Sequence, residues 1–254
     1  MELIHALQAE WIKTKRTAAS WLCLIGGTFI PFILLVGFIK DHESINDYKL
    51  TNIWEKYFFD SWRFMSLALL PAGVILASSL VTQIEYKNNT TKQLHTTPQK
   101  PGVIFFSKLI VIMIMTAELF LLFNIASLAT AIIPSLLFQH RLPIQPFPFL
   151  FYLKWNLWIY VTCLPIIALQ FFLALQFKNF IVPVGVGILI LVGTLILIKT
   201  WQYAWLSPYS YTPLLAIGDK STLDKINIPL LSLGYFSAAL LINYLLYISN
   251  KEKS

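Results

Sequence analysis

Long apolar runs dominate the chain and alternate with short polar segments. Six of these runs reach about 20 residues, the length that a helix needs to cross the hydrocarbon core of a bilayer. They are too long and continuous for barrel strands, and a backbone in lipid must satisfy its own hydrogen bonds. The pattern therefore predicts an all-α membrane protein with six spans, at Ala19–Ile39, Phe64–Thr82, Val103–Ile133, Asn156–Phe177, Phe180–Ile198 and Pro229–Ile248.

The first 18 residues predict a helix of a different kind. Apolar residues recur there at spacings of three and four, so they would share one face, and basic residues follow just before the first span. We expect an amphipathic elbow helix that lies in the headgroup region and meets a cytoplasmic partner. A simple basic anchor is the alternative. The residues concerned are Leu3, Ile4, Leu7 and Trp11 on the apolar face, and Lys13, Lys15 and Arg16 after it.

Composition and charge agree with a membrane protein. Only 12% of the residues are charged, against roughly 25% in soluble domains. The net charge is +7, and the basic residues flank the spans, so we expect them to meet anionic lipid headgroups and not nucleic acid. Ten of the 19 Lys and Arg residues fall on the N-terminal side of the membrane. The segments on that side are the shorter ones, so both termini are predicted to be cytoplasmic.

The whole chain, residues 1–254, is predicted to form a single transmembrane domain, with polar segments between its spans. Residues 83–102 form a polar island between spans two and three, on the predicted cytoplasmic side. Residues 199–228 are rich in aromatic residues, which favour the membrane interface, so this extracytoplasmic segment should fold back onto the membrane surface. Cys23 and Cys163 fall inside predicted spans, which indicates packing and not a disulfide framework.

Motifs for catalysis are absent from the sequence. There is no phosphate-binding loop of the G-x-x-x-x-G-K-[ST] type, no H-E-x-x-H and no G-x-S-x-G. The four histidines are scattered and lack the spacing of metal ligands. We therefore expect no enzyme activity, no catalytic residue, and neither metal nor cofactor on this chain.

Glu118 is the one ionisable residue predicted to lie deep within a span. A charge in lipid is costly, so such a residue suggests a role on a transport pathway, as a proton relay or a substrate contact. The alternative is structural, with Glu118 facing a partner helix or protonated and hydrogen-bonded. Neutral polar residues in or near spans are expected to form hydrogen bonds between helices. They are Asn124, Asn156, Gln170, Gln176 and Asn243.

Several features occur in the same order as in one known family. They are the stretch WIKTKR, Trp54 in the outer loop, Leu69–Pro71 in span two, Glu85 just after it, Lys108 opening span three, and the segment Ser207–Pro213. In this order the chain resembles the membrane subunit of a type-2 ATP-binding-cassette (ABC) exporter, and it is similar to the small bacterial permeases of lantibiotic immunity. The usual Trp before the Leu-x-x-x-Pro portion is missing, so the substrate does not follow from the resemblance.

The resemblance implies that the polar island is a coupling helix resting in a cleft of an ATP-binding subunit. It assigns ATPase coupling to Glu85, Tyr86, Lys87, Lys92, Leu94 and Pro98. ATP and Mg would be held by that partner subunit. A second permease copy or a paralogue would complete the transporter in the bacterial cytoplasmic membrane.

The expected function is ATP-driven export of an amphipathic or hydrophobic substrate, with a peptide antibiotic as the favoured class. A chain without a nucleotide site can be driven by ATP only through contact with a subunit that has one. Two alternatives remain open from the sequence. One is a secondary transporter driven by an ion gradient, and the other is a membrane sensor or scaffold that transports nothing.

Overall fold

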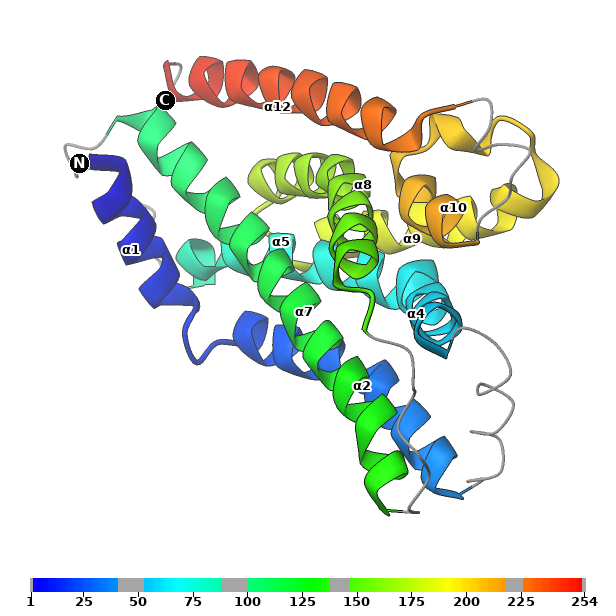
Figure 1. Cartoon of the computed structure of the whole chain (residues 1–254). Helices are drawn as coiled ribbons and strands as arrows, with labels where there is room; N and C mark the ends of the chain where they lie inside the picture. Colours follow the sequence, from blue (N-terminus) through cyan, green and yellow to red (C-terminus); the bar gives the residue numbers. More distant parts are fainter. Residues whose placement is uncertain (1, 41–52, 88–99, 138–146, 218–225, 253–254) are drawn as a thin grey trace.

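The structure is a bundle of helices around a central pair (Figure 1). The computed structural model describes residues 2–40, 53–87, 100–137, 147–217 and 226–252, which form helices and turns with no strand among them. Six helices in these ranges are long and apolar enough to cross a membrane. They confirm the six predicted spans, at Ala18–Lys40, Tyr57–Ile84, Pro101–Thr130, Phe149–Gln176, Ile181–Thr200 and Ile228–Ser249.

The second span begins earlier than the sequence predicted. Helix α4 (Ile53–Phe64) leads through a π-helical turn (Met65–Leu69) directly into α5 (Leu70–Lys87). In that turn the backbone N–H of Leu70 donates to the carbonyl oxygen of Met65, five residues back. The wide turn stands just before Pro71, which has no N–H to give, so the local hydrogen-bond pattern is already relaxed where the proline enters.

The central pair consists of α5 and α8 (Phe149–Gln176), which pack against each other. Helix α12 (Ile228–Glu252) covers α8, and α9 (Ile181–Thr200) covers α5. The longest contact joins α2 (Ala18–Lys40) to α7 (Pro101–Leu137), and in Figure 1 these two helices extend together beyond the rest of the bundle. Small residues allow the close approach, because a Cβ built on Gly27 would lie 3.0 Å from the Leu119 carbonyl oxygen.

The aromatic segment after α9 differs from the prediction. Short 3-10 turns at Ala204–Leu206 and Pro208–Ser210 lead into α10 (Tyr211–Ile217). Instead of lying on the membrane surface, the part from Pro208 onward packs among α8, α9 and the π turn, and Tyr209 is 1% exposed. The reason is that its hydroxyl finds a partner inside the bundle. The sequence pattern, being rich in Trp and Tyr, could not distinguish this position from an interfacial one.

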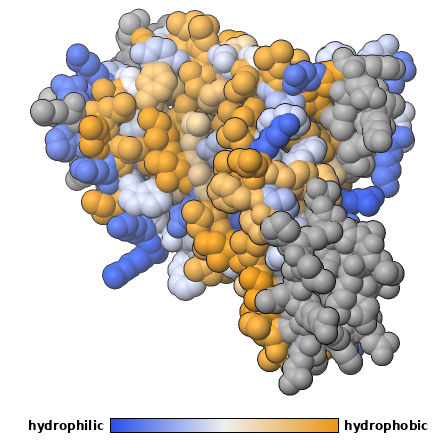
Figure 2. Space-filling model, viewed as in Figure 1, coloured by the Kyte–Doolittle hydropathy of each residue, from blue (hydrophilic) through white to orange (hydrophobic). Residues whose placement is uncertain are grey.

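The surface agrees with a protein immersed in lipid. Figure 2 shows apolar side chains over much of the middle of the visible face, with many hydrophilic ones toward its left and right ends. Many large apolar side chains are exposed on α2, α9 and α12, among them Phe32, Leu189 and Leu241. In water such a surface would be an aggregation hazard, whereas in a bilayer it meets lipid tails.

Candidate coupling face and pathway residues

Several chain segments meet at one end of the molecule, which we call the terminal face. It comprises α1 (Glu2–Thr14), the last turn of α5, the first turn of α7, the α8–α9 turn at residues 177–180, and the end of α12. Figure 1 shows the N- and C-termini close together there. Six spans place both ends of a chain on the same side of a membrane, so this grouping follows from the topology.

Helix α1 docks on α7 through a narrow face. Ala6, Glu10 and Thr14, each four residues apart, are buried. Leu7 and Trp11 also pack partly against the core. Leu3 is exposed, as is Ile4. The predicted apolar face is therefore divided, with its later half against the bundle and its first turn facing outward. An outward apolar turn at the end of a bundle fits an interfacial helix.

A buried ion pair fastens α1 to α7. The Lys108 Nζ donates to Glu10 Oε2 at 3.1 Å, and the Lys13 Nζ donates to Glu10 Oε1 at 2.6 Å. Glu10 and Lys108 are 6% and 4% exposed. Removing one member of such a pair is costly, because the other is left as a buried charge. The link therefore holds α1 in a defined position on the third span.

Sequence reasoning missed Glu10. Lys108 stood out as a basic residue near the start of span three, but α7 begins at Pro101, so Lys108 lies two turns inside the helix. A cation at that depth needs a counter-charge. The available signal was the spacing of Ala6, Glu10 and Thr14, which places the carboxylate between two small residues on one helix face.

A sharp corner follows α1. The Thr14 hydroxyl donates to the Trp11 carbonyl oxygen at 2.8 Å, and the Thr17 hydroxyl donates to the Thr14 carbonyl oxygen at 2.6 Å. Arg16 has a φ of 60°, in the left-handed region. For a residue with a Cβ this conformation costs roughly 1–2 kcal/mol. The chain accepts this cost at the point where α1 turns into the first span. Lys15 and Arg16 are both exposed there.

The predicted coupling residues are placed only in part. Glu85, Tyr86 and Lys87 form the last turn of α5. Lys92, Leu94 and Pro98 lie outside the described residues. One turn earlier, the Gln83 Nε2 donates to the Phe177 carbonyl oxygen at 2.7 Å, which ties the end of α5 to the α8–α9 turn. The end of α5, which leads into the polar island, is thus anchored to the end of α8.

Glu118 lies on the outer side of α7, near the middle of the third span. Its neighbour Leu119 is buried against α2, whereas Glu118 itself is exposed. Exposed apolar residues on α7 share its face at helical spacing. They are Ile114, Leu121 and Ile125. A charge in lipid is costly, so an acidic residue at this position is a candidate for contact with a group outside this chain.

Neutral polar residues join the helices, as predicted. The deepest cluster centres on Gln170 of α8, which is fully buried. Its Nε2 donates to the Pro183 carbonyl oxygen at 2.6 Å and to Ser79 Oγ at 3.2 Å, and the Tyr209 hydroxyl donates to its Oε1 at 3.1 Å. Burial raises the pKa of Tyr209 well above its ordinary value, so the hydroxyl keeps its proton and its donor role. This central network connects α5, α8, α9 and the aromatic segment that begins at Pro208.

Two further contacts confirm the same prediction. Asn124 of α7 and Asn156 of α8 exchange hydrogen bonds of 2.8 and 3.0 Å, and Asn243 of α12 donates to the Ala168 carbonyl oxygen at 2.8 Å. Gln176 is exposed at the end of α8. Four of the five predicted polar residues therefore link two helices, which is the role that amides take in lipid.

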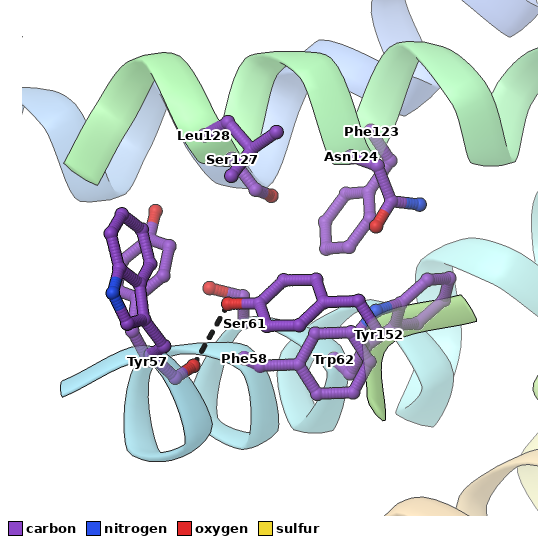
Figure 3. Close-up of a pocket in the computed structure, with 10 residues that line it drawn as sticks. Tyr57, Phe58, Ser61, Trp62, Phe123, Asn124, Ser127, Leu128 and Tyr152 are labelled. Carbon is purple, nitrogen blue, oxygen red and sulfur yellow. Dashed lines mark hydrogen bonds between the residues drawn. The ribbon is translucent and has the colours of Figure 1, made fainter. Parts of the chain in front are cut away.

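A small cavity lies between α4, α7 and α8, toward the opposite end of the bundle from the terminal face (Figure 3). Asn124 and Ser127 border it from α7, whereas Ser61 and Trp62 border it from α4. The Tyr152 hydroxyl closes one side by donating to the Trp54 carbonyl oxygen at 2.8 Å. Its volume of about 10 Å³ suits a single water and excludes a substrate.

Metal-binding geometry is lacking in the described ranges, where no three His, Cys, Asp or Glu side chains come together. What the described residues do provide is a mechanical arrangement. Helix α1 is fastened to α7 by an ion pair, and the end of α5 is hydrogen-bonded to the α8–α9 turn. The amide network of Gln170 lies at the centre.

A sequence profile of the ABC-2 family transporter proteins matches residues 6–194, most of the chain. The chain belongs to this family. As an ABC-2 protein it is a multi-pass transmembrane subunit of an ABC transporter, which pairs with an ATP-binding subunit. Family membership confirms the general resemblance seen in the sequence. The chain matches no curated protein and no solved structure.

Proposed function

We propose that the chain is the permease of an ATP-driven exporter and that ATP and Mg bind only to its partner subunit. The observation that carries the proposal is the buried Glu10–Lys108 pair, which fastens an end helix to a membrane span. A permease driven from outside needs such a rigid connection, because coupling requires a contact that differs between the two nucleotide states.

The proposed input is the polar island, residues 83–102, with Glu85, Tyr86 and Lys87 at its start. Closure of the ATP-binding subunits would push on the end of α5. The Gln83–Phe177 hydrogen bond would pass that push to the α8–α9 turn, and the Glu10–Lys108 pair would make α1 and α7 move together. The terminal face is cytoplasmic in this proposal, in accordance with the distribution of basic residues.

The proposed substrate is an amphipathic or hydrophobic molecule that enters from lipid, with a cationic peptide antibiotic as the favoured class. Glu118 supports this choice, because it places a carboxyl group on a lipid-facing stripe where a cationic amphiphile would find a counter-charge. A second permease copy or a paralogue would form the other half of the pathway, in a bacterial cytoplasmic membrane.

Charge reversal tests the coupling. The variant Glu85→Lys, co-expressed with the host's ATP-binding subunit, should insert normally and lose at least about tenfold of its substrate-stimulated ATPase activity, as expected for a coupling contact worth about 1.4 kcal/mol or more. A matched reversal at the opposite end, Lys199→Glu, should leave that activity near the wild-type value. Full activity in Glu85→Lys would show that the island does not carry the input.

A double-mutant cycle tests the clamp. Glu10→Gln and Lys108→Gln should each reduce coupling, and the double variant should be no worse than the single ones because the two residues act as one pair. Lys15→Gln, at an exposed lysine five residues from Glu10, serves as the control. Strictly additive losses in the double variant would contradict a direct role of the pair.

The gradient-driven alternative makes an opposite prediction about Glu118. If transport used a proton gradient, Glu118→Gln would abolish it and dissipating the gradient would stop it. The exporter proposal expects transport by Glu118→Gln to depend on ATP, with weaker selection for cationic substrates over neutral ones. Vesicles prepared with and without ATP separate the two cases.

A further inference from the structure

A second and much larger cavity opens at the terminal face, and the export scheme assigns no ligand to it. It has a volume of about 720 Å³ and lies between the α1–α2 corner, the end of α5 and the α8–α9 turn. Sites for small molecules usually measure about 300–1,000 Å³. The cavity is therefore large enough for a ligand and not only for solvent.

Its charged lining is entirely basic. Arg16 enters from the corner and Lys178 from the turn, and no Asp or Glu is among the described residues that border it. The two cations are 162 positions apart in the sequence, so only the fold brings them to one cavity. Arg16 stands at the left-handed position of the corner. Strained backbone of this kind is often found where a site requires one side chain in one place.

The rest of the lining combines polar and apolar residues. Gln83 and Asn179 contribute amides, whereas Leu80 and Phe180 contribute apolar surface. The first residues of α2 and the N-cap residue of α9, Phe180, also border the cavity, so the positive ends of two helix dipoles add to the field of the cations. Such a lining fits a ligand with an anionic head and an apolar tail.

The position of the cavity favours a lipid as that ligand. Its apolar residues lie at the ends of two membrane spans and directly before a third, where headgroups and acyl chains meet. Basic pockets between transmembrane helices are known to hold acidic lipid headgroups. We propose that this cavity binds the headgroup of an anionic phospholipid, with the phosphate between Arg16 and Lys178 and the acyl chains along α2 and α5. The proposal depends on the membrane setting alone and not on the substrate or on coupling.

Native mass spectrometry of the purified full-length chain tests the site. Phosphatidylglycerol should bind more tightly than phosphatidylcholine with the same acyl chains. Arg16→Gln and Lys178→Gln should each weaken its binding about fivefold, and the double variant about 25-fold, as expected for two interfacial cations. Lys154→Gln with Lys199→Gln, two exposed lysines at the other end, is the matched control and should bind as the wild type does.

A second variant separates a defined cavity from diffuse attraction. Ala18→Trp keeps both cations and fills the space from an exposed position, so it should also lower phosphatidylglycerol binding. Unchanged binding in this variant, or in the double cation variant, would overturn the proposal. Equal affinity for phosphatidylcholine would do the same.

Inorganic phosphate distinguishes a lipid headgroup from a free anion. Phosphate binding that competes with the lipid and depends on both cations would support the headgroup position. Phosphate binding without lipid binding would assign the site to a free anion and overturn the lipid proposal.

Because lipid binding is measured without ATP or substrate, its failure would leave the export proposal intact. Conversely, loss of ATPase coupling in Glu85→Lys would not change the lipid result.

Discussion

The central spans and the outer spans are built from similarly apolar sequence but are packed very differently. In the most apolar stretches of the second and fourth spans, 61% of the residues are buried inside the molecule. The corresponding shares are 17% for α2, 22% for α9 and 11% for α12. Yet α2 and α9 are the more apolar helices. Hydropathy therefore indicates which segments enter the membrane and says little about which of them face protein.

Small and polar residues decide that second question. On α5 the buried positions include Ala77, Ser78 and Ser79, and on α8 they include Ala168 and Gln170. Lipid tails are as apolar as Leu, so helices in a membrane gain little by burying Leu against each other. They gain by close approach and by satisfying polar groups, which is what these residues allow.

The strongest test of this contrast is a glycine pair on α9. A Cβ at Gly187 would lie 2.6 Å from Gln170 Oε1 and 2.9 Å from Ile75 Cγ2, whereas a Cβ at Gly185 would meet nothing within 4 Å. Gly187→Val should lower the free energy of unfolding by about 3 kcal/mol through overpacking. Gly185→Val should change it by less than about 0.5 kcal/mol. Unfolding in detergent, followed by tryptophan fluorescence, compares them. Equal effects would mean that α9 does not pack on the central pair as described.

The next test removes the central amide. Gln170→Leu keeps the volume similar and leaves the Tyr209 hydroxyl and the Pro183 carbonyl oxygen without their partner. We expect the free energy of unfolding to fall by about 2 kcal/mol. Each buried polar group left unpaired costs about 1–3 kcal/mol, and relaxation of the structure recovers part of that cost. Gln176→Leu, on the exposed end of the same helix, should be nearly neutral. A neutral Gln170→Leu would refute the importance of the network.

The smallest effect is expected at the outermost span. Asn243 is the residue of α12 that donates to the Ala168 carbonyl oxygen. Asn243→Leu should cost about 0.6–1 kcal/mol, the usual worth of one such bond between membrane helices. Ser237→Ala, at an exposed hydroxyl that donates within its own helix, is the control. If Asn243→Leu lowered the free energy of unfolding more than Gln170→Leu does, the outer span would contribute more to stability than the central network, contrary to this prediction.

The sequence predicted the six spans because each is defined by a local property, the length of an apolar run. It missed α4, since Glu55, Lys56, Asp60 and Arg63 interrupt the apolar pattern there. The buried face of α4 is carried by Trp54, Phe58 and Trp62, which are spaced four apart and pack against α7 and α8. That spacing can be seen in the sequence. Without knowledge of the neighbouring helices, however, aromatic residues among charged ones are equally typical of a loop at the membrane interface.

The candidate site was harder to predict for the same reason. The partners in the Glu10–Lys108 pair are 98 positions apart, and those in the Tyr209–Gln170 bond are 39 apart. A buried charge or amide indicates that a partner exists without indicating which one. Glu118 is the reverse case, because the sequence identified it as isolated and the structure leaves it exposed on α7.

The π turn at Met65–Leu69 has a consequence for the tolerance of this helix to insertions and deletions. A wide turn holds one residue more than a regular turn, and one residue corresponds to about 100° of rotation around a helix axis. Deleting one residue of the π turn would therefore give a regular helix from α4 to α5 and keep Trp54, Phe58 and Trp62 on the side of α7 and α8. Deleting one residue from a regular turn of the same helix would instead rotate these aromatic side chains by about 100° relative to α5. The π turn is thus a place where this helix can lose a residue and still keep its aromatic packing.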